Sequence, residues 1–184
     1  MLVTVDPASM VLDMLADTID ALNKGESADA TVLEHLAHAV DADAAVSVYF
    51  DEEDAFEPVA VVPSQQAAQA LLDHVEDVGA AGLETHFRIS EVPGLGHVVL
   101  VLIQPTDEAA PIEGFGRIIA LSRSYPFDEE SQRLLHRACR PLNVLWPRAA
   151  QAYVQERASN AEFNITERER QVLELLSRGL LATS

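Results

Sequence analysis

The sequence contains one cysteine and one lysine among its 184 residues, and aromatic side chains make up only 5% of it. Since a disulfide needs two cysteines, Cys139 alone excludes an intramolecular disulfide framework, and this fits a reducing compartment. The only lysine, Lys24, lies at the end of the first predicted helix. A phosphoacceptor receiver domain needs a lysine after a later strand, so this class is excluded.

Positive charge is also scarce, because 12 basic residues stand against 30 acidic ones and the formal net charge is -18. A surface that binds nucleic acid must neutralise phosphates, so this composition argues against DNA as a direct partner of most of the chain. No apolar run approaches the length of a membrane span, and no signal peptide begins the sequence. We therefore expect a cytoplasmic protein without a membrane partner. The 48% of hydrophobic residues are enough for a folded core.

Signatures of catalysis and metal binding are missing as well. The sequence has no Gly-x-Ser-x-Gly motif, no phosphate-binding glycine loop and no Cys/His pair in a recognisable context, so we predict that it is not an enzyme. His35 and His38 lie close together on a predicted helix but have no third ligand, and the acidic run 51–54 lacks the glycine and final glutamate of a calcium loop. We predict no metal site, and the sequence identifies no cofactor.

Hydrophobic periodicity predicts alternating helices and strands. Helices are expected at 10–23, 31–40, 63–75 and 129–158, and strands at 44–50, 56–62, 86–89, 97–103 and 115–122. Asp128 is the expected N-cap of the last helix, and Cys139 is an expected core residue on it. Pro141 and Pro147 should kink that helix or divide it, with a kink and hinge near Pro141. This order predicts an α+β fold, an antiparallel sheet flanked by helices, with a long closing helix.

The end of the sequence has the pattern of a short capped helix. Thr166 and Glu169 have the spacing of a capping box, in which each side chain binds the backbone N–H of the other residue. Val172 and Leu176 then share one apolar face. Gly179 stands where a helix ends in the left-handed conformation.

This run resembles the start of the DNA-binding domain of LuxR-family transcription regulators. The family pattern is matched at Ile165, Thr166, Arg168, Glu169, Val172, Leu173, Leu175, Leu176, Gly179 and Leu180. The resemblance implies that this is the first helix of a helix-turn-helix domain, whose turn, recognition helix and final helix would follow. Because the sequence stops at Ser184, we expect a regulator truncated inside that domain, with residues 1–158 as one domain and 159–184 as linker and fragment. DNA binding is then expected only of the full-length protein.

The preceding domain is similar to a GAF domain, a small-molecule sensor fold that commonly stands upstream of LuxR-type DNA-binding domains. The sharpest match is the closing strand 116–123, followed by Pro126-Phe127-Asp128 and the long helix; a PAS-like topology is the nearest alternative. The resemblance implies a small-molecule ligand, with pocket-lining candidates Tyr49, Val61, His86, Arg88, Val99, Val101 and Arg117. The alternative is a GAF-like scaffold that has lost its ligand and only dimerises.

The first and closing helices supply more apolar surface than one sheet face needs, and in GAF-containing regulators such helices build a parallel dimer. Two-fold DNA sites are usually bound by two-fold proteins, so we predict a homodimer. The expected dimerisation residues on the closing helix are Leu134, Leu142, Leu145, Trp146 and Tyr153. A ligand would then act by shifting this helix.

Overall fold

The computed structural model describes residues 7–50, 56–63, 65–79, 87–103 and 116–162. Each helix and strand predicted up to residue 158 is present, with ends that differ by a few residues. The elements are α1 (Pro7–Lys24), α2 (Asp29–Ala39), β1 (Ala44–Phe50), β2 (Phe56–Val62), α3 (Gln65–Val78), β3 (Phe87–Val92), β4 (Gly96–Ile103), β5 (Gly116–Arg123) and α4 (Glu129–Glu162).

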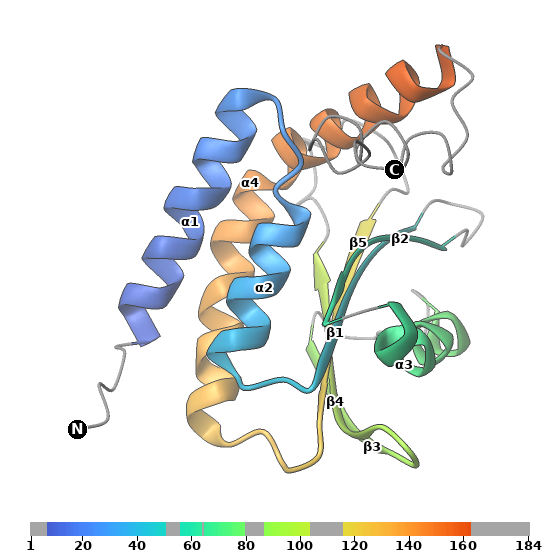
Figure 1. Ribbon diagram of the computed structural model, residues 1–184. Helices are drawn as coiled ribbons and strands as arrows, with labels where there is room; N and C mark the ends of the chain where they lie inside the picture. Colours follow the sequence, from blue (N-terminus) through green and yellow to red (C-terminus); the bar gives the residue numbers. More distant parts are fainter. Residues whose placement is uncertain (1–6, 51–55, 64, 80–86, 104–115, 163–184) are drawn as a thin grey trace, which may run out of the picture.

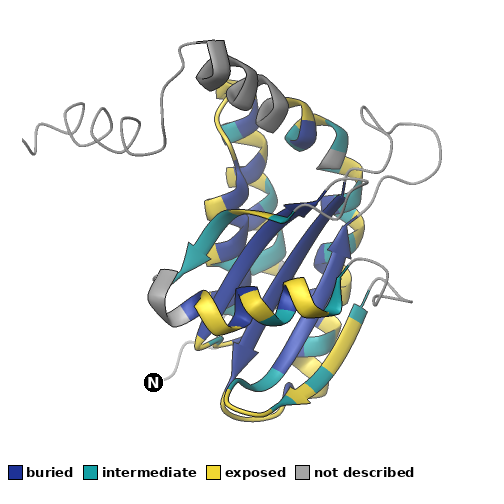
Figure 2. Ribbon diagram, turned by 90° about the vertical axis from the view of Figure 1, so that its right-hand side faces the viewer, coloured by how far each residue is buried: buried dark blue, intermediate teal, exposed yellow. Residues whose placement is uncertain are grey.

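The five strands form one antiparallel sheet in the order β2-β1-β5-β4-β3. The helices α1, α2 and α4 cover one side of this sheet and α3 covers the other (Figure 1). With helices on both sides, every residue of the central strands β1 and β5 is buried (Figure 2). We call the two sides the three-helix face and the α3 face. The predicted α+β architecture is confirmed.

Strand alternation divides the core into two clusters, because successive side chains of a strand point to opposite faces. On the three-helix face, strand residues Tyr49, Val101 and Ile119 pack with Leu33 and Leu135 of the helices. The cluster on the α3 face contains Val46, Val48, Phe50, Leu71, Leu72, Val75, Val98, Leu100, Leu102, Ile118 and Ala120. The two cores explain why β1 is apolar at every position but Ser47, and why β5 is apolar from Ile118 to Leu121.

α1 and α4 lie side by side and run in the same direction. Near their ends, Nη2 of Arg148 on α4 donates to Oδ1 of Asn23 on α1 at 3.0 Å. Near their starts, Met10 of α1 and Leu134 of α4 line the same small hollow. The two pairs are separated by nearly the same number of residues on both helices, so the helices are parallel. α1 contacts α2 and α4, and its other side faces outward.

α4 is one continuous helix that contains both Pro141 and Pro147, so the prolines do not divide it in two. Figure 1 shows that the helix changes direction along its length. The predicted N-cap is confirmed, since the backbone N–H of Ser131 donates to Oδ1 of Asp128 at 2.8 Å. α4 continues to Glu162, through the stretch 158–161 that was expected to be a linker. The predicted helix-turn-helix fragment lies outside the described residues.

The buried side chain of Arg123 connects the end of β5 by hydrogen bonds to the chain beside two helices. Its Nη1 donates to the carbonyl of Val40 at 2.6 Å, just after α2, and its Nη2 donates to the carbonyl of Pro126 at 2.5 Å, just before α4. Its guanidinium also stacks on the rings of Tyr125 and Phe127, 4.3 and 4.2 Å from their centroids. This role of Arg123 was not predicted from the sequence.

The expected dimerisation residues need a correction. Leu134 and Leu142 are buried in the core of the three-helix face, so they offer a second copy very little surface. The prediction was wrong because helical periodicity identifies an apolar face but not whether the sheet or a second molecule covers it. Leu145 is half-buried. The side chains of Trp146 and Tyr153 lie outside the described part of the chain.

Candidate functional site

Five polar side chains are brought together under the connection between α1 and α2. Asp29 of α2 and Arg117 of β5 form an ion pair, and Ser27, Ser47 and Tyr49 hydrogen-bond to it. We call these five residues the Asp29–Arg117 cluster. Its position on the three-helix face is unusual, because the surrounding core is apolar.

Local structure places each member of the cluster. Asp29 lies in the first turn of α2, where the helix dipole stabilises a negative charge. Ser47 and Tyr49 are two residues apart on β1 and therefore point to the same face. The antiparallel register of β1 and β5 sets Arg117 directly opposite Tyr49.

The carboxylate of Asp29 accepts from three side chains. Nη1 of Arg117 lies 3.1 Å from Oδ1, and the hydroxyl of Ser27 donates to Oδ2 at 2.8 Å. The hydroxyl of Tyr49 lies 3.2 and 3.3 Å from the two oxygens. Nε of Arg117 donates to the hydroxyl oxygen of Ser47 at 2.7 Å. The carboxylate is therefore well satisfied although only 6% of the side chain is exposed.

The guanidinium of Arg117 is less completely satisfied than its partner. The side chain is 4% exposed, and its Nη2 has no acceptor within the described part of the chain. A buried N–H group without an acceptor costs about 1 to 3 kcal/mol, and more when the group is charged. Such groups in native proteins usually have a water, an ion or a ligand as partner. The cluster therefore offers one charged donor to an acceptor from outside the described chain.

The structure places the six described ligand candidates on both faces of the sheet. Tyr49 and Arg117 meet in the cluster, and two more lie on the same face, Val99 and Val101. Val61 packs against the core of the α3 face. Arg88 pairs with Leu100, which also faces α3. The pKa of His74 on that helix is lowered by burial and, to a smaller extent, by the charge of Arg88. His86 lies outside the described residues.

The six described candidates therefore do not line one pocket, and that part of the prediction is wrong. The reason is that the pairing of the strands decides which side of the sheet each side chain faces, and the sequence alone does not show this pairing. The residues that sequence reasoning missed are Ser27, Asp29 and Ser47. An aspartate in the first turn of a helix is usually solvated. The position of Asp29 in the sequence therefore does not indicate that it has a buried partner.

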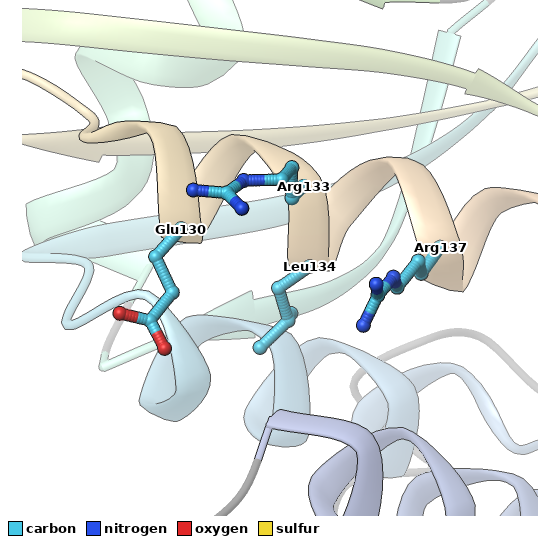
Figure 3. Close-up of a pocket in the computed structure, with 4 residues that line it drawn as sticks. All are labelled: Glu130, Arg133, Leu134 and Arg137. Atoms are coloured by element: carbon cyan, nitrogen blue, oxygen red, sulfur yellow. The ribbon is translucent and has the colours of Figure 1, made fainter.

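The surface also carries an open hollow beside the first half of α4. Glu130, Arg133, Leu134 and Arg137 line a volume of about 330 Å³, and Figure 3 shows Glu130 and Leu134 pointing from α4 toward α1 and α2. A neighbouring hollow of about 270 Å³ shares Glu130 and Leu134 with it and reaches Met10 of α1. This surface is distinct from the buried cluster.

The described residues contain no group of three His, Cys, Asp or Glu side chains that could hold a metal ion. The single thiol, Cys139, packs against the core of the three-helix face, and burial raises its pKa to about 11. It therefore stays protonated at neutral pH and is a poor nucleophile. None of the described helices is both long and apolar enough to cross a membrane.

Comparison of the fold with solved structures finds GAF domains and LuxR-family proteins. A phycoerythrobilin-bound GAF domain from a cyanobacterial phytochrome has 12% identity and a TM-score of 0.57, covering 82% of this chain and 100% of that one. The LBD domain of VqsR from Pseudomonas aeruginosa has 10% identity and a TM-score of 0.51, covering 77% and 96%. CepR2 from Burkholderia cenocepacia, an N-acylhomoserine lactone-dependent LuxR-family transcription factor, has 15% identity and a TM-score of 0.50, covering 82% and 99%.

The comparisons establish a GAF-like fold. No protein-family model matches the sequence, and no match is found among curated proteins.

Proposed function

We propose that this chain is the regulatory region of a cytoplasmic LuxR-type transcription regulator, with a binding rather than a catalytic role. It senses a small molecule through its GAF-like domain, dimerises, and controls a DNA-binding domain that begins with the helix predicted near Thr166. Two independent observations support this proposal. The run from Ile165 to Leu180 matches the family pattern, and the GAF-like fold is shared with solved LuxR-family proteins.

The observation that carries the sensor role is Nη2 of Arg117, which finds no acceptor among the described residues and belongs to a buried ion-pair cluster. A cluster that only stabilised the fold would do better with every donor satisfied. The free N–H groups suit a ligand with an acceptor oxygen, such as a carbonyl or a carboxylate. Since Asp29 already balances the charge of Arg117, a neutral carbonyl compound fits as well as an anion.

The position of the cluster gives the ligand a route to the DNA-binding domain. Asp29 belongs to the first turn of α2, α2 contacts α1, and α1 contacts α4, which leads toward the helix near Thr166. An acceptor bound to Nη2 of Arg117 would share its positive charge with Asp29, which is paired through Nη1, and so change the strength of the ion pair. We propose that this changes the packing of α1 against α4.

The experiment is native mass spectrometry of the chain purified from cells, compared with its denatured mass. We expect a retained small mass in the wild type and in Ser47→Ala, which leaves the Nη2 edge of Arg117 in place. Arg117→Lys keeps a positive charge for Asp29 but has no second nitrogen, so it should fold and lose that mass.

Circular dichroism and thermal unfolding would establish that the lysine variant is folded. A retained mass that Arg117→Lys still holds would place the ligand elsewhere. A clean protein mass, together with no thermal stabilisation by an extract of the host's metabolites, would contradict the sensor role. It would instead favour the dimerisation scaffold, for which the exposed outer surface of α1 and α4 is the supporting observation.

A further inference from the structure

We infer that the outer face of the first half of α4 binds an acidic helical segment of another protein. This face consists of Arg133, Arg137, Arg140 and Val144, and we call it the arginine stripe. The inference goes beyond the proposed function, because it adds a second macromolecule and depends on neither a small-molecule ligand nor a dimer.

The arginine stripe is one continuous face of α4. Its four residues are separated by four, three and four positions, which places them above one another on a helix with 3.6 residues per turn. All four are exposed, and Val144, at 73%, is the most exposed large hydrophobic residue among those that the structure describes. The opposite face of the helix, which includes Leu135 and Leu142, packs in the core. The stripe is therefore directed toward solvent.

The stripe concentrates positive charge in a strongly acidic chain. Between Ser131 and Gln155 the sequence contains no aspartate or glutamate, although the whole chain has 30 of them and only 12 basic residues. The net charge of -18 already favours solubility, so solubility does not require a basic face. Its charge instead complements that of an acidic partner.

Neighbouring residues neutralise only one end of the stripe. An oxygen of Glu129 lies 3.5 Å from Nη2 of Arg133, and both side chains are largely exposed, so this ion pair is weak. Arg137 and Arg140 have no ion-pair partner within the described ranges of the chain. Two arginine side chains are therefore available to carboxylates of a partner.

The stripe also offers apolar contacts. Arg133 and Arg137 line a hollow of about 330 Å³ together with Glu130 and the buried Leu134 (Figure 3). This volume has room for an aliphatic side chain of a partner, and Val144 provides a second apolar contact further along the helix. A surface that combines basic and apolar groups fits an amphipathic acidic helix, whose carboxylates can repeat with the same spacing as the arginines.

Nucleic acid fits this surface less well than an acidic protein does. Phosphates would pair with the arginines, but they would leave Val144 and the hollow exposed to water. The net charge of the chain also repels a long polyanion. A helix with carboxylates and aliphatic side chains on one face satisfies both parts of the stripe.

Fluorescence anisotropy with designed peptides tests the inference. The probe is a labelled helical peptide with glutamates at i, i+4 and i+7 and leucines on the same face, and the comparison peptide has glutamines in place of the glutamates. The wild-type chain should bind the glutamate peptide at least about tenfold more tightly. Arg137→Ala with Arg140→Ala should remove this preference. Arg137→Glu with Arg140→Glu should instead prefer a peptide with lysines at the same positions.

The matched control is Lys24→Ala with Arg88→Ala, which also removes two positive charges. Lys24 forms an exposed ion pair with Asp20 within α1, and Arg88 lies on β3, so this variant should bind the glutamate peptide like the wild type. Circular dichroism would establish that all variants are folded.

Four outcomes would overturn the inference. The wild type could bind both peptides equally or not at all, or the control variant could lose as much affinity as the double alanine variant. A DNA duplex could bind more tightly than the glutamate peptide at the same salt concentration, which would assign the stripe to nucleic acid. In sedimentation, the wild type could self-associate and the double alanine variant could fail to do so, which would make a second copy the occupant.

Discussion

Arg117 and Asp29 approach to 3.1 Å between the start of β5 and the first turn of α2, with side chains only 4% and 6% exposed. Each side chain provides the opposite charge that balances the other, since both are almost completely buried. Buried pairs of this kind add little stability over an apolar pair, but removing one partner leaves an unbalanced charge. Replacing one partner of the pair should therefore destabilise the folded chain strongly, although the intact pair stabilises it little more than an apolar pair would.

The first prediction concerns the two halves of this pair. Asp29→Ala should lower the free energy of unfolding by about 3 to 5 kcal/mol, because the guanidinium of Arg117 stays buried without a counter-charge. Tyr49→Phe removes one hydrogen bond to the same carboxylate and should cost only about 1 kcal/mol. Urea denaturation followed by circular dichroism measures both values.

Replacing both partners separates burial of charge from the interaction itself. Asp29→Leu combined with Arg117→Met should be less destabilising than either change alone, because no unpaired charge remains. If the costs of the two single changes simply add, the two residues do not compensate each other and the assignment of the pair is wrong.

Much of the fold was predictable because helices and strands leave a local periodicity in the sequence. The strand Ala44–Phe50, for example, was predicted with its observed ends. The cluster was not predictable, because Asp29 and Arg117 are far apart in the sequence. The register of β1 and β5 sets Arg117 beside Tyr49, and the packing of α2 against β1 brings Asp29 to both. The same limit explains Leu134, since an apolar helix face looks alike whether a sheet or a second molecule covers it.

A second prediction uses two glycines in the turn between β3 and β4. Gly94 and Gly96 both have positive φ, +85° and +76°, so alanine at either position is strained by about 1 kcal/mol. An added Cβ at Gly94 meets open space, whereas at Gly96 it would lie 2.5 Å from the carbonyl oxygen of Arg123. Gly96→Ala should therefore lower the melting temperature clearly more than Gly94→Ala. Equal shifts of the melting temperature in differential scanning calorimetry would show that the backbone at Arg123 moves to accommodate the added Cβ at little cost in free energy.

A third prediction concerns the cap of α4. Asp128→Ala removes the acceptor for the backbone N–H of Ser131 and should cost about 1 kcal/mol, while Asp128→Asn keeps an acceptor and should cost less. The same hydrogen bond lowers the pKa of Asp128 from its ordinary 3.8. The stabilisation that this hydrogen bond gives the folded chain is therefore present above pH 3.8. It is lost as the pH falls through the lower pKa that Asp128 has in the folded chain. Urea denaturation should show the alanine variant and the wild type converging at acidic pH, and a constant gap would contradict the assignment.

The last prediction follows from the half-buried thiol on α4. Burial raises the pKa of Cys139 from 9.0 to about 11, so the folded chain holds this proton more tightly than the unfolded chain does. The stabilisation is fully present below pH 9.0 and is lost as the pH rises to about 11, where the folded thiol also ionises. Over this window the free energy of unfolding should fall by at most about 2 to 3 kcal/mol through this group.

Cys139→Ala separates this effect from the other groups that titrate at high pH, because it removes the thiol and leaves the rest of the chain unchanged. The difference in unfolding free energy between the wild type and this variant should shrink as the pH rises from 9.0 to about 11. The wild-type thiol should also react with iodoacetamide much more slowly than the thiol of the unfolded chain, because the reactive thiolate is rarer in the folded state. A pH-independent difference together with fast alkylation would show that Cys139 is exposed, and that α4 packs less closely on the sheet there.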